Sequence, residues 1–455
     1  MKTRPHFPSF AASLQRSDVR FFRYVVTFVT FVAVAAGAQA QPVRPQPGAL
    51  RATVEKLVSF GTRHSASSTS DPKRGIGAAR TWIAGEFQKL SAACGGCITV
   101  DRPSARFEGP RAPTGLIVED VLGIQRGTGD PNHIVIVSGH VDSRNSDVMD
   151  AAGDAPGAND DASGVALVME AARLLSKERH TATIVYAVLS AEEQGLWGGK
   201  LLADTAKARG WTIAAMLNND IVGNTKGQDG RVVADRVRVF SEGARAVEDL
   251  AATKLRRASG GEDDSSSRAL AKRVGDVATA DKGGLSAFLV RRPDRFGRGG
   301  DHTPLLEAGY PAVRFTVGVE NYDAQHQNLR TENGRVFGDT VDRMDFPYLA
   351  RVTALNVAVL RQLAAAPGAP ASVVLEGAVS TDTTVKWAAV PGAAGYRLRW
   401  RRADRTAWAQ SRDVDATATS EVLKGIIVDD TFVGVSALSA TGAESLVTFG
   451  GLAPR

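Results

Sequence analysis

Cysteine is scarce in this chain of 455 residues, which has only two, Cys94 and Cys97, in a Cys-Gly-Gly-Cys run. A structural zinc knuckle would need further cysteines or nearby histidines, and none lie close in sequence. The pair lies between a predicted helix over 77–90 and a strand that begins near residue 98, whereas a redox Cys-x-x-Cys pair usually begins a helix after a strand. We therefore predict a structural disulfide rather than a redox pair or a metal site.

The sequence also lacks a basic patch interleaved with aromatic residues. Its formal net charge is +6 and aromatic residues make up 6% of it, and much of that charge lies in the first forty residues. This distribution argues against nucleic acid as a partner. The shares of hydrophobic residues, 43%, and charged residues, 23%, are those of an ordinary globular protein.

Apolar runs long enough to span a bilayer are absent after the N-terminal segment. There, Arg20 and Arg23 precede an apolar run over 24–36, and Ala38-Gln39-Ala40 supplies the small residues of a cleavage site. The alternative is a membrane anchor, but the run is short for a transmembrane helix. We predict that residues 1–40 are a signal peptide. The mature protein would then be periplasmic or secreted, without stable insertion in a membrane.

Predicted strands alternate with predicted helices from about residue 41 to residue 366. Nearly continuous apolar runs at 133–139 and 182–189 are typical of buried parallel strands. The segment 165–176 between them has apolar residues at helical spacing. This alternation predicts an α/β domain with a doubly wound, mostly parallel (mixed) sheet and helices on both faces.

A second domain is predicted over 367–455. An Ala/Pro/Gly-rich linker at 364–370 precedes it, and short alternating strands follow. Trp387 and the alternation at 396–401 resemble a fibronectin type III β-sandwich. We expect this small all-β domain to attach the protein to a surface, a polymer or a partner, or only to pack against the first domain.

Five metal-binding side chains follow the predicted strands or precede a helix. They are His140, Asp160, Glu193, Asp220 and His326. Taken singly, each has an ordinary explanation, such as a helix cap or a solvated carboxylate. Together they lie where open α/β sheets place their ligands, at the carboxyl ends of strands. Two imidazoles and three carboxylates suit two zinc ions that share one carboxylate, as in a two-metal hydrolase.

The order of the motifs resembles the M28 family of zinc peptidases over about residues 50–363. The motifs are Gly-His-Val-Asp at 139–142, Gly-Ala-Asn-Asp-Asp-Ala-Ser-Gly at 157–164, Ala-Glu-Glu-Gln-Gly at 191–195, Asn-Asn-Asp at 218–220 and a late histidine. The resemblance implies the zinc exopeptidase fold and two zinc ions per chain.

The resemblance also implies which residues hold these ions. His140 would ligate the first zinc, and Asp160 would bridge both. Of the remaining ligands, Glu193 would bind one ion and Asp220 the other, and His326 would complete the set.

Two further roles follow from the same resemblance. Glu192 would be the general base that takes a proton from the bridging water. Asp142 would orient the ring of His140. The peptide bond between Asp160 and Asp161 would be cis, as it is in the family.

The sequence departs from the family pattern in its last part. The late histidine usually stands in a His-Thr-x-x-Asp-Thr run, but here His326 is followed only later by Gly338-Asp339-Thr340. His302 is an alternative ligand, and we prefer His326 because it follows the last strand. A tyrosine that steadies the oxyanion in some relatives is not evident. We assign Arg298 and Asp301 to the substrate or oxyanion region, with Arg298 as the substitute for that tyrosine.

We therefore predict an exported di-zinc exopeptidase that acts on peptides. The main hypothesis is an aminopeptidase that removes N-terminal residues by attack of a metal-bridged hydroxide. The alternatives are a zinc carboxypeptidase or dipeptidase on the same scaffold, a glutaminyl cyclase with one zinc, and a non-catalytic binding module. The complete ligand set argues against the cyclase, and the presence of both ligands and base argues against the binding module.

Overall fold

The fold is that of a computed structural model, which describes residues 44–281 and 283–453. The predicted signal peptide over 1–40 lies outside these residues. In the part of the chain that is described, every helix is too short or too polar to cross a membrane.

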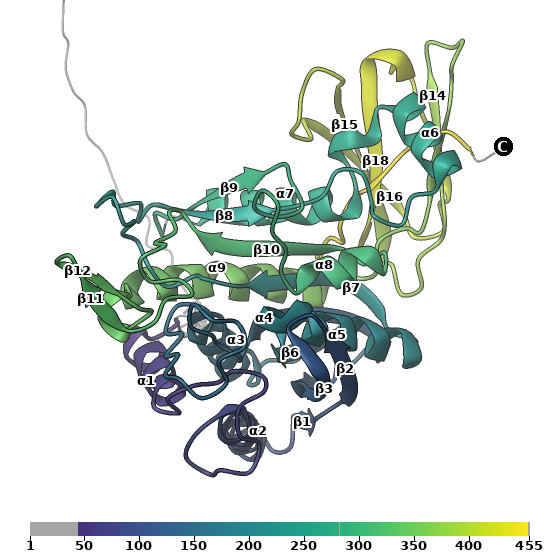
Figure 1. The fold of residues 1–455 in the computed structure, drawn as a ribbon. Helices are drawn as coiled ribbons and strands as arrows, with labels where there is room; N and C mark the ends of the chain where they lie inside the picture. The colour runs from purple at the N-terminus through teal and green to yellow at the C-terminus, as the bar shows by residue number, and fades with distance from the viewer. Residues whose placement is uncertain (1–43, 282, 454–455) are drawn as a thin grey trace, which may run out of the picture. The chain divides into compact units, whose positions relative to one another are not determined.

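The centre of the fold is an eight-stranded sheet in the order β1-β4-β6-β5-β7-β10-β8-β9 (Figure 1). Its strands are β1 (Ile98–Asp101), β4 (Val121–Gln125), β5 (His133–His140), β6 (Thr183–Leu189), β7 (Thr212–Asn219), β8 (Arg236–Phe240), β9 (Ser286–Val290) and β10 (Ala312–Val317). The four central strands β6, β5, β7 and β10 are parallel. Strand β4 joins them antiparallel on one side and β8 on the other. This confirms the predicted α/β fold with a mixed sheet.

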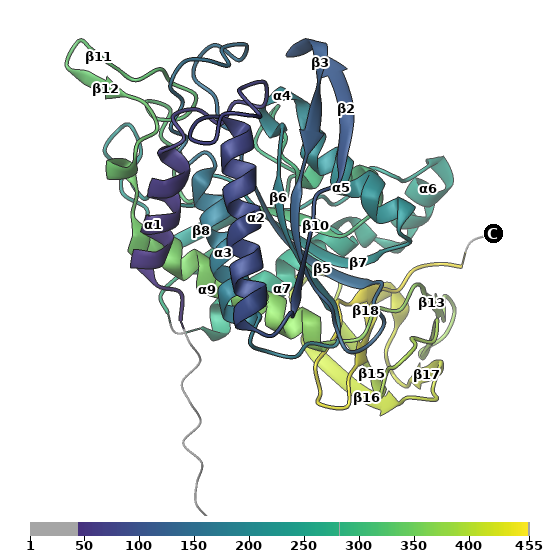
Figure 2. The ribbon, with the colours of Figure 1, turned by 90° about the horizontal axis from the view of Figure 1, so that it is seen from below.

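Helices cover both faces of this sheet (Figure 2). One face packs against α1 (Pro47–Val58), α2 (Ile76–Ala93), α3 (Ala162–Leu175), α7 (Ser266–Ala280) and α9 (Phe346–Ala365), and the other against α5 (Trp197–Ala208) and α8 (His302–Glu307). Side chains of a strand alternate between the faces, so Val135 and Val137 join the first core and Ile134 and Ile136 the second. Burial on both faces explains why the sequence of β5 is apolar almost throughout.

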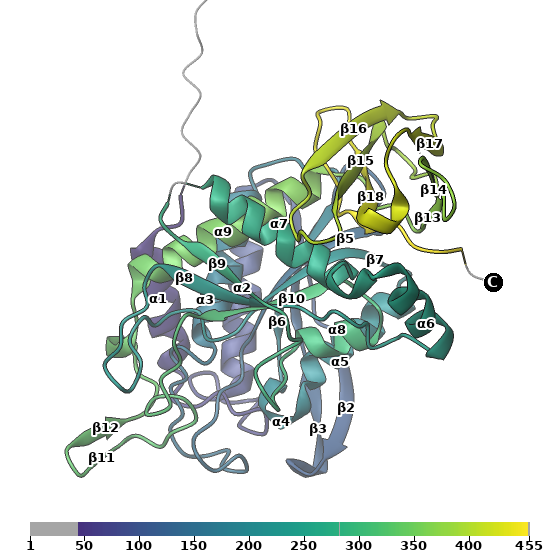
Figure 3. The ribbon, with the colours of Figure 1, turned by 90° about the horizontal axis from the view of Figure 1, so that it is seen from above.

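Two hairpins extend the end of the sheet where the parallel strands finish (Figure 3). They are formed by β2 (Ser104–Gly109) with β3 (Ala112–Glu119), and by β11 (Arg330–Glu332) with β12 (Arg335–Phe337). Phe107 of the first hairpin stacks on Trp197 of α5, with ring centroids 5.7 Å apart. The shorter elements η1 (Gly261–Asp263), α6 (Leu250–Ser259) and η2 (Val341–Arg343) complete this part of the chain.

The C-terminal part forms the small all-β unit that the sequence predicts. One sheet has β13 (Val373–Glu376), β14 (Thr383–Trp387) and β17 (Ser420–Leu423), and the other has β16 (Gln410–Asp415), β15 (Gly395–Arg402), β18 (Thr431–Leu438) and β19 (Thr448–Phe449), with η3 (Val428–Asp430) before β18. Their shared core contains Trp387, Tyr396 and Leu398. The likeness to fibronectin type III and the domain boundary near residue 366 stay predictions.

The all-β unit lies near the amino ends of β5 and β7, away from α4 (Glu192–Gly195) and the two hairpins (Figures 2 and 3). An ion pair of 2.5 Å joins Arg401 of β15 to Asp264. The guanidinium of Arg273 in α7 also donates to the carbonyl oxygens of Glu444 and Ser445. These contacts hold the unit at the end of the sheet opposite the carboxyl ends of the parallel strands.

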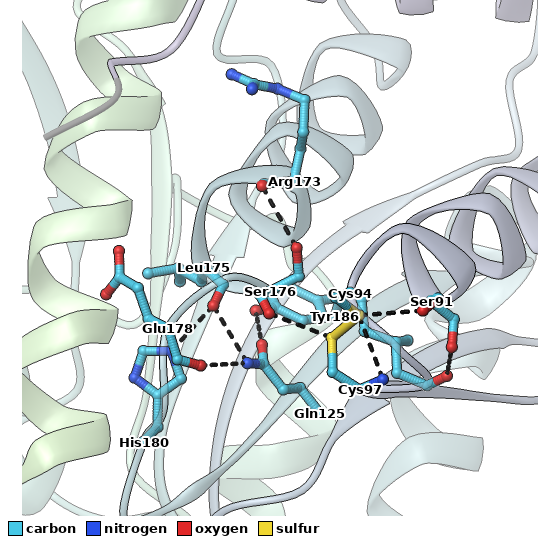
Figure 4. The surroundings of a disulfide bond; sticks show 11 residues. Ser91, Cys94, Cys97, Gln125, Arg173, Leu175, Ser176, Glu178, His180 and Tyr186 are labelled. Carbon is cyan, nitrogen blue, oxygen red and sulfur yellow. Dashed lines mark hydrogen bonds between the residues drawn. A yellow bond between two sulfur atoms is a disulfide. The ribbon is translucent and has the colours of Figure 1, made fainter.

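The two cysteines form a disulfide in the turn between α2 and β1 (Figure 4). Cys94 ends α2, and the sulfur of Cys97 lies 3.2 Å from the carbonyl oxygen of Ser176. The bond therefore closes a tight turn after a helix, which is the arrangement of a structural disulfide.

Candidate active site

The five predicted metal-binding side chains come together at the carboxyl ends of the parallel strands. His140 is the last residue of β5, and Asp220 directly follows β7. Glu193 lies in α4, which begins after β6, and His326 lies in the loop that follows β10. Asp160 precedes α3. Segments far apart in sequence thus meet where the parallel strands end, the usual place of ligands in open α/β sheets.

Asp160 lies between the two histidines. Its Oδ1 is 3.3 Å from His140 Nε2, and its Oδ2 is 3.0 Å from His326 Nε2. On one side His140 Nε2 is 3.8 Å from Asp220 Oδ1, and on the other His326 Nε2 is 2.8 Å from Glu193 Oε1. The site therefore consists of two neighbouring groups of donors that share one carboxylate.

These donors fit metal ions. In two sets of three residues, possible ligand atoms lie within 4.8 Å of one another; the sets are His140 with Glu192 and Asp220, and Asp160 with Glu193 and His326. The first set contains Glu192 where the prediction has Asp160, whose Oδ1 nevertheless lies 3.3 Å from His140 Nε2. Among the described residues, His140 Nε2 and Glu193 Oε1 are buried, make no hydrogen bond of good geometry, and face the other donors of the site. Buried polar atoms are rarely left in this way without a ligand or another functional reason. Imidazole nitrogens and carboxylates are donors that zinc accepts.

Asp142 links the end of β5 to α4. Its side chain is completely buried and accepts hydrogen bonds from the backbone N–H groups of Glu192, at 3.2 Å, and Glu193, at 3.1 Å. His140 Nδ1 lies 3.5 Å from Asp142 Oδ1. His140 Nδ1 makes its hydrogen bond to the backbone carbonyl oxygen of Asp142, at 3.1 Å, while the Asp142 side chain fixes the backbone that carries the two adjacent glutamates.

Glu192 is the carboxylate of this group that reaches the cavity with partial exposure. Burial raises the pKa of Glu192 well above its usual value, and the carboxylates of Asp220 and Glu193 act in the same direction. Glu193 beside it is buried. Both glutamates line the cavity, but Glu193 is buried whereas Glu192 is partly exposed.

The backbone that carries Asp160 is fixed by Asp339, a residue to which the sequence analysis gave no role. The Asp339 carboxylate accepts from the N–H groups of Asn159, at 2.9 and 3.0 Å, and of Asp160, at 2.7 Å. Asp161 caps α3 through Gly164 N–H and accepts from His140 N–H at 3.0 Å. The peptide bond between Asp160 and Asp161 is cis, as the resemblance implies.

The buried side chain of Arg63 supports the loop that leads to Asp160. Arg63 donates to the carbonyl oxygens of Val141 at 2.7 Å, Pro156 at 2.6 Å and Gly157 at 2.9 Å. It thus ties the end of β5 to the segment before Asp160. A single arginine after a helix carries no sequence signal for such a role, and the sequence analysis missed it.

The alternative ligand His302 stands outside the two donor groups. It begins α8, and its Nε2 lies 2.8 Å from the carbonyl oxygen of Pro293. Asp301 is also buried and accepts from the N–H of Gly199 at 3.0 Å. Burial raises the pKa of Asp301 to about 7. Arg298, in contrast, lines the cavity, and its Nη1 is 3.0 Å from Glu320 Oε2.

Arg314 is a further charged residue that the sequence analysis did not assign. It lies within β10 and is completely buried, with Nη2 2.8 Å from Asp220 Oδ2 and Nη1 3.3 Å from Asp294 Oδ2. Although burial favours the neutral form, these carboxylates raise the pKa of Arg314 above its usual value. The signal in the sequence that could have identified Arg314 is the presence of an arginine within a mostly apolar strand.

A cavity of about 880 Å³ lies over the donor groups. It is lined by Arg111, Arg144, Ser146, Asp160, Glu192, Glu193, Gly195, Leu196, Asp220, Arg295, Gly297, Arg298, Gly299, Tyr322, Gln325, His326 and Gln327. Its volume suits part of a short peptide or another small ligand, because ligand pockets commonly measure roughly 300–1,000 Å³. The donors are thus accessible to a substrate.

Comparisons with solved structures give weak likenesses. An aminopeptidase from Aneurinibacillus is 16% identical with a TM-score of 0.48 and covers 71% of this chain and 95% of its own. A glutaminyl cyclase from Porphyromonas gingivalis has the same identity, 16%, and the same TM-score, 0.48, over 70% and 99% of the two chains. At these TM-scores the likenesses carry no functional argument.

Comparisons of sequence are much stronger. A protein of Leptosphaeria maculans named a probable zinc metalloprotease is 41% identical over 400 residues, which cover 87% of this chain and 92% of the relative. A protein of the same description from Pyricularia oryzae is 39% identical over 423 residues, or 91% and 84% of the two chains. The profile of peptidase family M28 matches residues 120–358. The chain therefore belongs to peptidase family M28 and is a metallopeptidase.

Proposed function

We propose that the protein is an exported di-zinc aminopeptidase that removes single residues from the N-termini of peptides. The observation that carries the proposal is the position of Asp160, whose two carboxylate oxygens face the two histidines at 3.3 and 3.0 Å beneath an open cavity. One carboxylate between two donor groups is what a pair of ions with a shared ligand requires.

Each group would hold one zinc ion. His140 and Asp220 would bind the first, Glu193 and His326 the second, and Asp160 both. The names of the relatives support zinc, as do the imidazole and carboxylate donors. When bound, the ions supply a Lewis acid for the scissile carbonyl group and lower the pKa of water.

The protein's own residues would bind, orient and move protons. Glu192 reaches into the cavity beside His140 and Asp220, so its carboxylate would take a proton from the attacking water and deliver it to the leaving amine. Asp142 would keep Glu192 at that position, because it binds the backbone N–H of both glutamates. The free α-amino group of the substrate would lie against the carboxylates of the site.

Export is supported by the N-terminal sequence pattern and by the disulfide. Arg20, Arg23, the apolar run over 24–36 and Ala38-Gln39-Ala40 follow the order of a secretory signal. A structural disulfide such as Cys94–Cys97 is stable in an oxidising compartment. We propose a periplasmic or secreted location.

The test is cleavage of matched peptides followed by mass spectrometry. Each sequence is offered with a free N-terminus, with an acetylated N-terminus and with an amidated C-terminus, to the wild-type protein, to chelator-treated protein and to Glu192→Gln. We expect stepwise loss from free N-termini, with or without the C-terminal amide, and its abolition by chelator and by the substitution.

Other outcomes would replace the proposal. Cleavage of acetylated but not amidated peptides would identify a carboxypeptidase. Loss of ammonia from N-terminal glutamine without shortening of the peptide would identify a glutaminyl cyclase. Intact peptides, with two zinc ions bound per chain, would indicate a binding protein.

A further inference from the structure

The charged side chains that line the cavity fall into two sets. One set is the carboxylates Asp160, Glu192, Glu193 and Asp220, all of which the proposed function assigns to metal binding or proton transfer. The other set is the four arginines Arg111, Arg144, Arg295 and Arg298. Among the described lining residues, the charged groups to which the proposed function gives no role are therefore the four arginines.

The arginines reach the cavity from separate parts of the fold. Arg111 lies at the turn of the β2–β3 hairpin, Arg144 in the loop after β5, and Arg295 and Arg298 in the segment between β9 and α8. The hairpin is held in place by the stacking of Phe107 on Trp197. Arg111 Nη1 donates to the backbone carbonyl oxygen of Glu193 at 2.6 Å, which holds this guanidinium against α4 at the wall of the cavity.

The positive charge at Arg298 is only partly balanced. Glu320 accepts from Arg298 at 3.0 Å, but the same carboxylate also contacts Arg238 at 2.7 Å and Arg295 at 3.5 Å. The single negative charge of Glu320 is thus shared by three guanidinium groups. Arg295 has a second partner in Asp294. The side chain of Arg298 is 33% exposed, so its remaining N–H groups can bind a ligand.

Arg144 provides a second cation beside the donor groups. Its Nε lies 3.3 Å from Glu193 Oε2, and its Nη2 lies 2.9 Å from His326 Nδ1. Because Glu193 is assigned to a metal ion in the proposed function, the charge of Arg144 would not be cancelled by that carboxylate alone. A substrate anion near this edge of the site would be attracted by Arg144, Arg111 and Arg298 together.

We propose that the cavity selects peptides with a carboxylate close to the scissile bond, which the guanidinium groups of Arg298, Arg111 and Arg144 bind. Arginine recognises carboxylates by paired, charge-assisted hydrogen bonds. The carboxylate belongs either to an acidic side chain in the first two residues or to the C-terminus of a very short peptide. This inference rests on the proposed function for the position of the scissile bond.

Binding to the Glu192→Gln protein, loaded with zinc, tests the inference apart from catalysis. Isothermal titration calorimetry compares Glu-Ala-Ala-amide with Gln-Ala-Ala-amide, Ala-Glu-Ala-amide with Ala-Gln-Ala-amide, and free Ala-Ala with its amide. We expect the carboxylate member of at least one pair to bind about tenfold more tightly or better. The pair that responds identifies the source of the carboxylate.

Substitutions assign the preference to the arginines. Arg298→Gln and, separately, Arg111→Gln in the same background should reduce the preference at least severalfold, whereas Arg298→Lys should keep part of it. Arg292→Gln is the matched control, because Arg292 lies in the same segment, is exposed and contacts the Phe296 ring. It should leave the preference unchanged.

The outcomes separate this inference from the proposed function. The inference is overturned if the two peptides of every pair differ less than twofold in affinity, or if no peptide binds. This holds even if the wild-type protein cleaves peptides. A preference that is lost in Arg292→Gln but kept in both Arg298→Gln and Arg111→Gln also overturns it. A preference for carboxylates without any cleavage supports the inference and rejects the aminopeptidase activity proposed above. If Arg298 instead stabilises the oxyanion, Arg298→Gln lowers kcat equally for acidic and neutral peptides and leaves the binding preference intact, which rejects the inference for this residue.

Discussion

Arg314 Nη2 lies 2.8 Å from Asp220 Oδ2, across the boundary between the neighbouring parallel strands β10 and β7. Both side chains are buried. Burial would raise the pKa of Asp220, but the guanidinium of Arg314 and the nearby His140 lower it instead. A proposed metal ligand is therefore kept ionised by a cation that belongs to the sheet itself.

Replacement of Arg314 by leucine should strongly destabilise the protein. The substitution leaves Asp220 and Asp294 buried without their cationic partner, and breaking a buried ion pair on one side typically costs roughly 3–5 kcal/mol. Urea unfolding of chelator-treated protein, followed by circular dichroism, measures the change without a contribution from bound metal. Arg335→Leu is the control. The side chain of Arg335 forms an ion pair with Asp323 and is 57% exposed. This control substitution should lower the free energy of unfolding by less than about 1 kcal/mol. Equal decreases for Arg314→Leu and Arg335→Leu would contradict a special role of the buried ion pair.

Asp339→Asn should weaken the site without a direct contact to substrate. The amide retains one oxygen, so it can serve only part of the set of N–H groups that Asp339 accepts from Asn159 and Asp160. Loss of such a supporting carboxylate typically lowers metal affinity or activity by about 10–100-fold. Competition with a zinc-sensitive dye measures the affinity. Asp342→Asn, an exposed neighbour, should change it little; an unchanged affinity in Asp339→Asn would show that the backbone at Asp160 holds its position without this contact.

The sequence predicted the parallel core of the fold because its strands are buried on both faces and therefore almost wholly apolar, as in β5. It did not predict β2 as a strand, because alternate residues of that hairpin strand are exposed and the others only partly buried. Nor did it predict β16, which is exposed at nearly every position. Apolar periodicity is a signal of burial, and edge strands bury too little to produce one.

The same reasoning explains which parts of the site were found. Four of the five proposed ligands, His140, Asp160, Glu193 and Asp220, stand in short motifs whose residue types carry their own chemistry, whereas His326 was chosen by its place after the last strand. Asp339 and Arg63 act on backbone groups of the loops around Asp160. A contact between a side chain and a distant backbone N–H or carbonyl group depends on the fold and leaves no local pattern in the sequence. Supporting residues of this kind therefore emerge only from the structure.

Metal content should distinguish the roles of the histidines. Under the proposed function, His326→Ala removes a ligand of one ion only, whereas Asp160→Ala removes a ligand of both. After dialysis against weak chelator, inductively coupled plasma mass spectrometry should find about two zinc ions per chain in the wild-type protein, fewer in His326→Ala and the fewest in Asp160→Ala. His302→Asn is the matched control, because His302 contacts Pro293 rather than the donor groups. Loss of an ion from His302→Asn, with full retention in His326→Ala, would transfer the ligand role to His302.

Glu444 in the all-β unit should make the stability of the protein depend on pH. Its carboxylate accepts from Arg399 at 2.6 Å and from Ser436 Oγ at 2.6 Å, and its side chain is 9% exposed. Burial by itself would raise the pKa of Glu444, but these hydrogen bonds lower it from 4.5 to about 2. The folded state therefore favours the ionised form of Glu444 more strongly than the unfolded state does. This contribution to the free energy of unfolding is fully present above pH 4.5 and is lost as pH falls toward 2.

Glu444→Gln should therefore lower the free energy of unfolding by about 2–3 kcal/mol at pH 6. The difference from the wild-type protein should narrow steadily between pH 4.5 and pH 3, because in this range the unfolded wild-type protein takes up a proton at Glu444 while the folded protein, with a pKa of about 2, does not. Guanidinium unfolding at a series of pH values, followed by Trp fluorescence, measures both curves. Glu421→Gln removes a partly exposed ion pair with Arg412, and its free energy of unfolding should stay within about 1 kcal/mol of the wild-type value throughout. A gap for Glu444→Gln that is constant from pH 6 to pH 3 would mean that the variant loses packing or hydrogen bonds rather than the charge of Glu444.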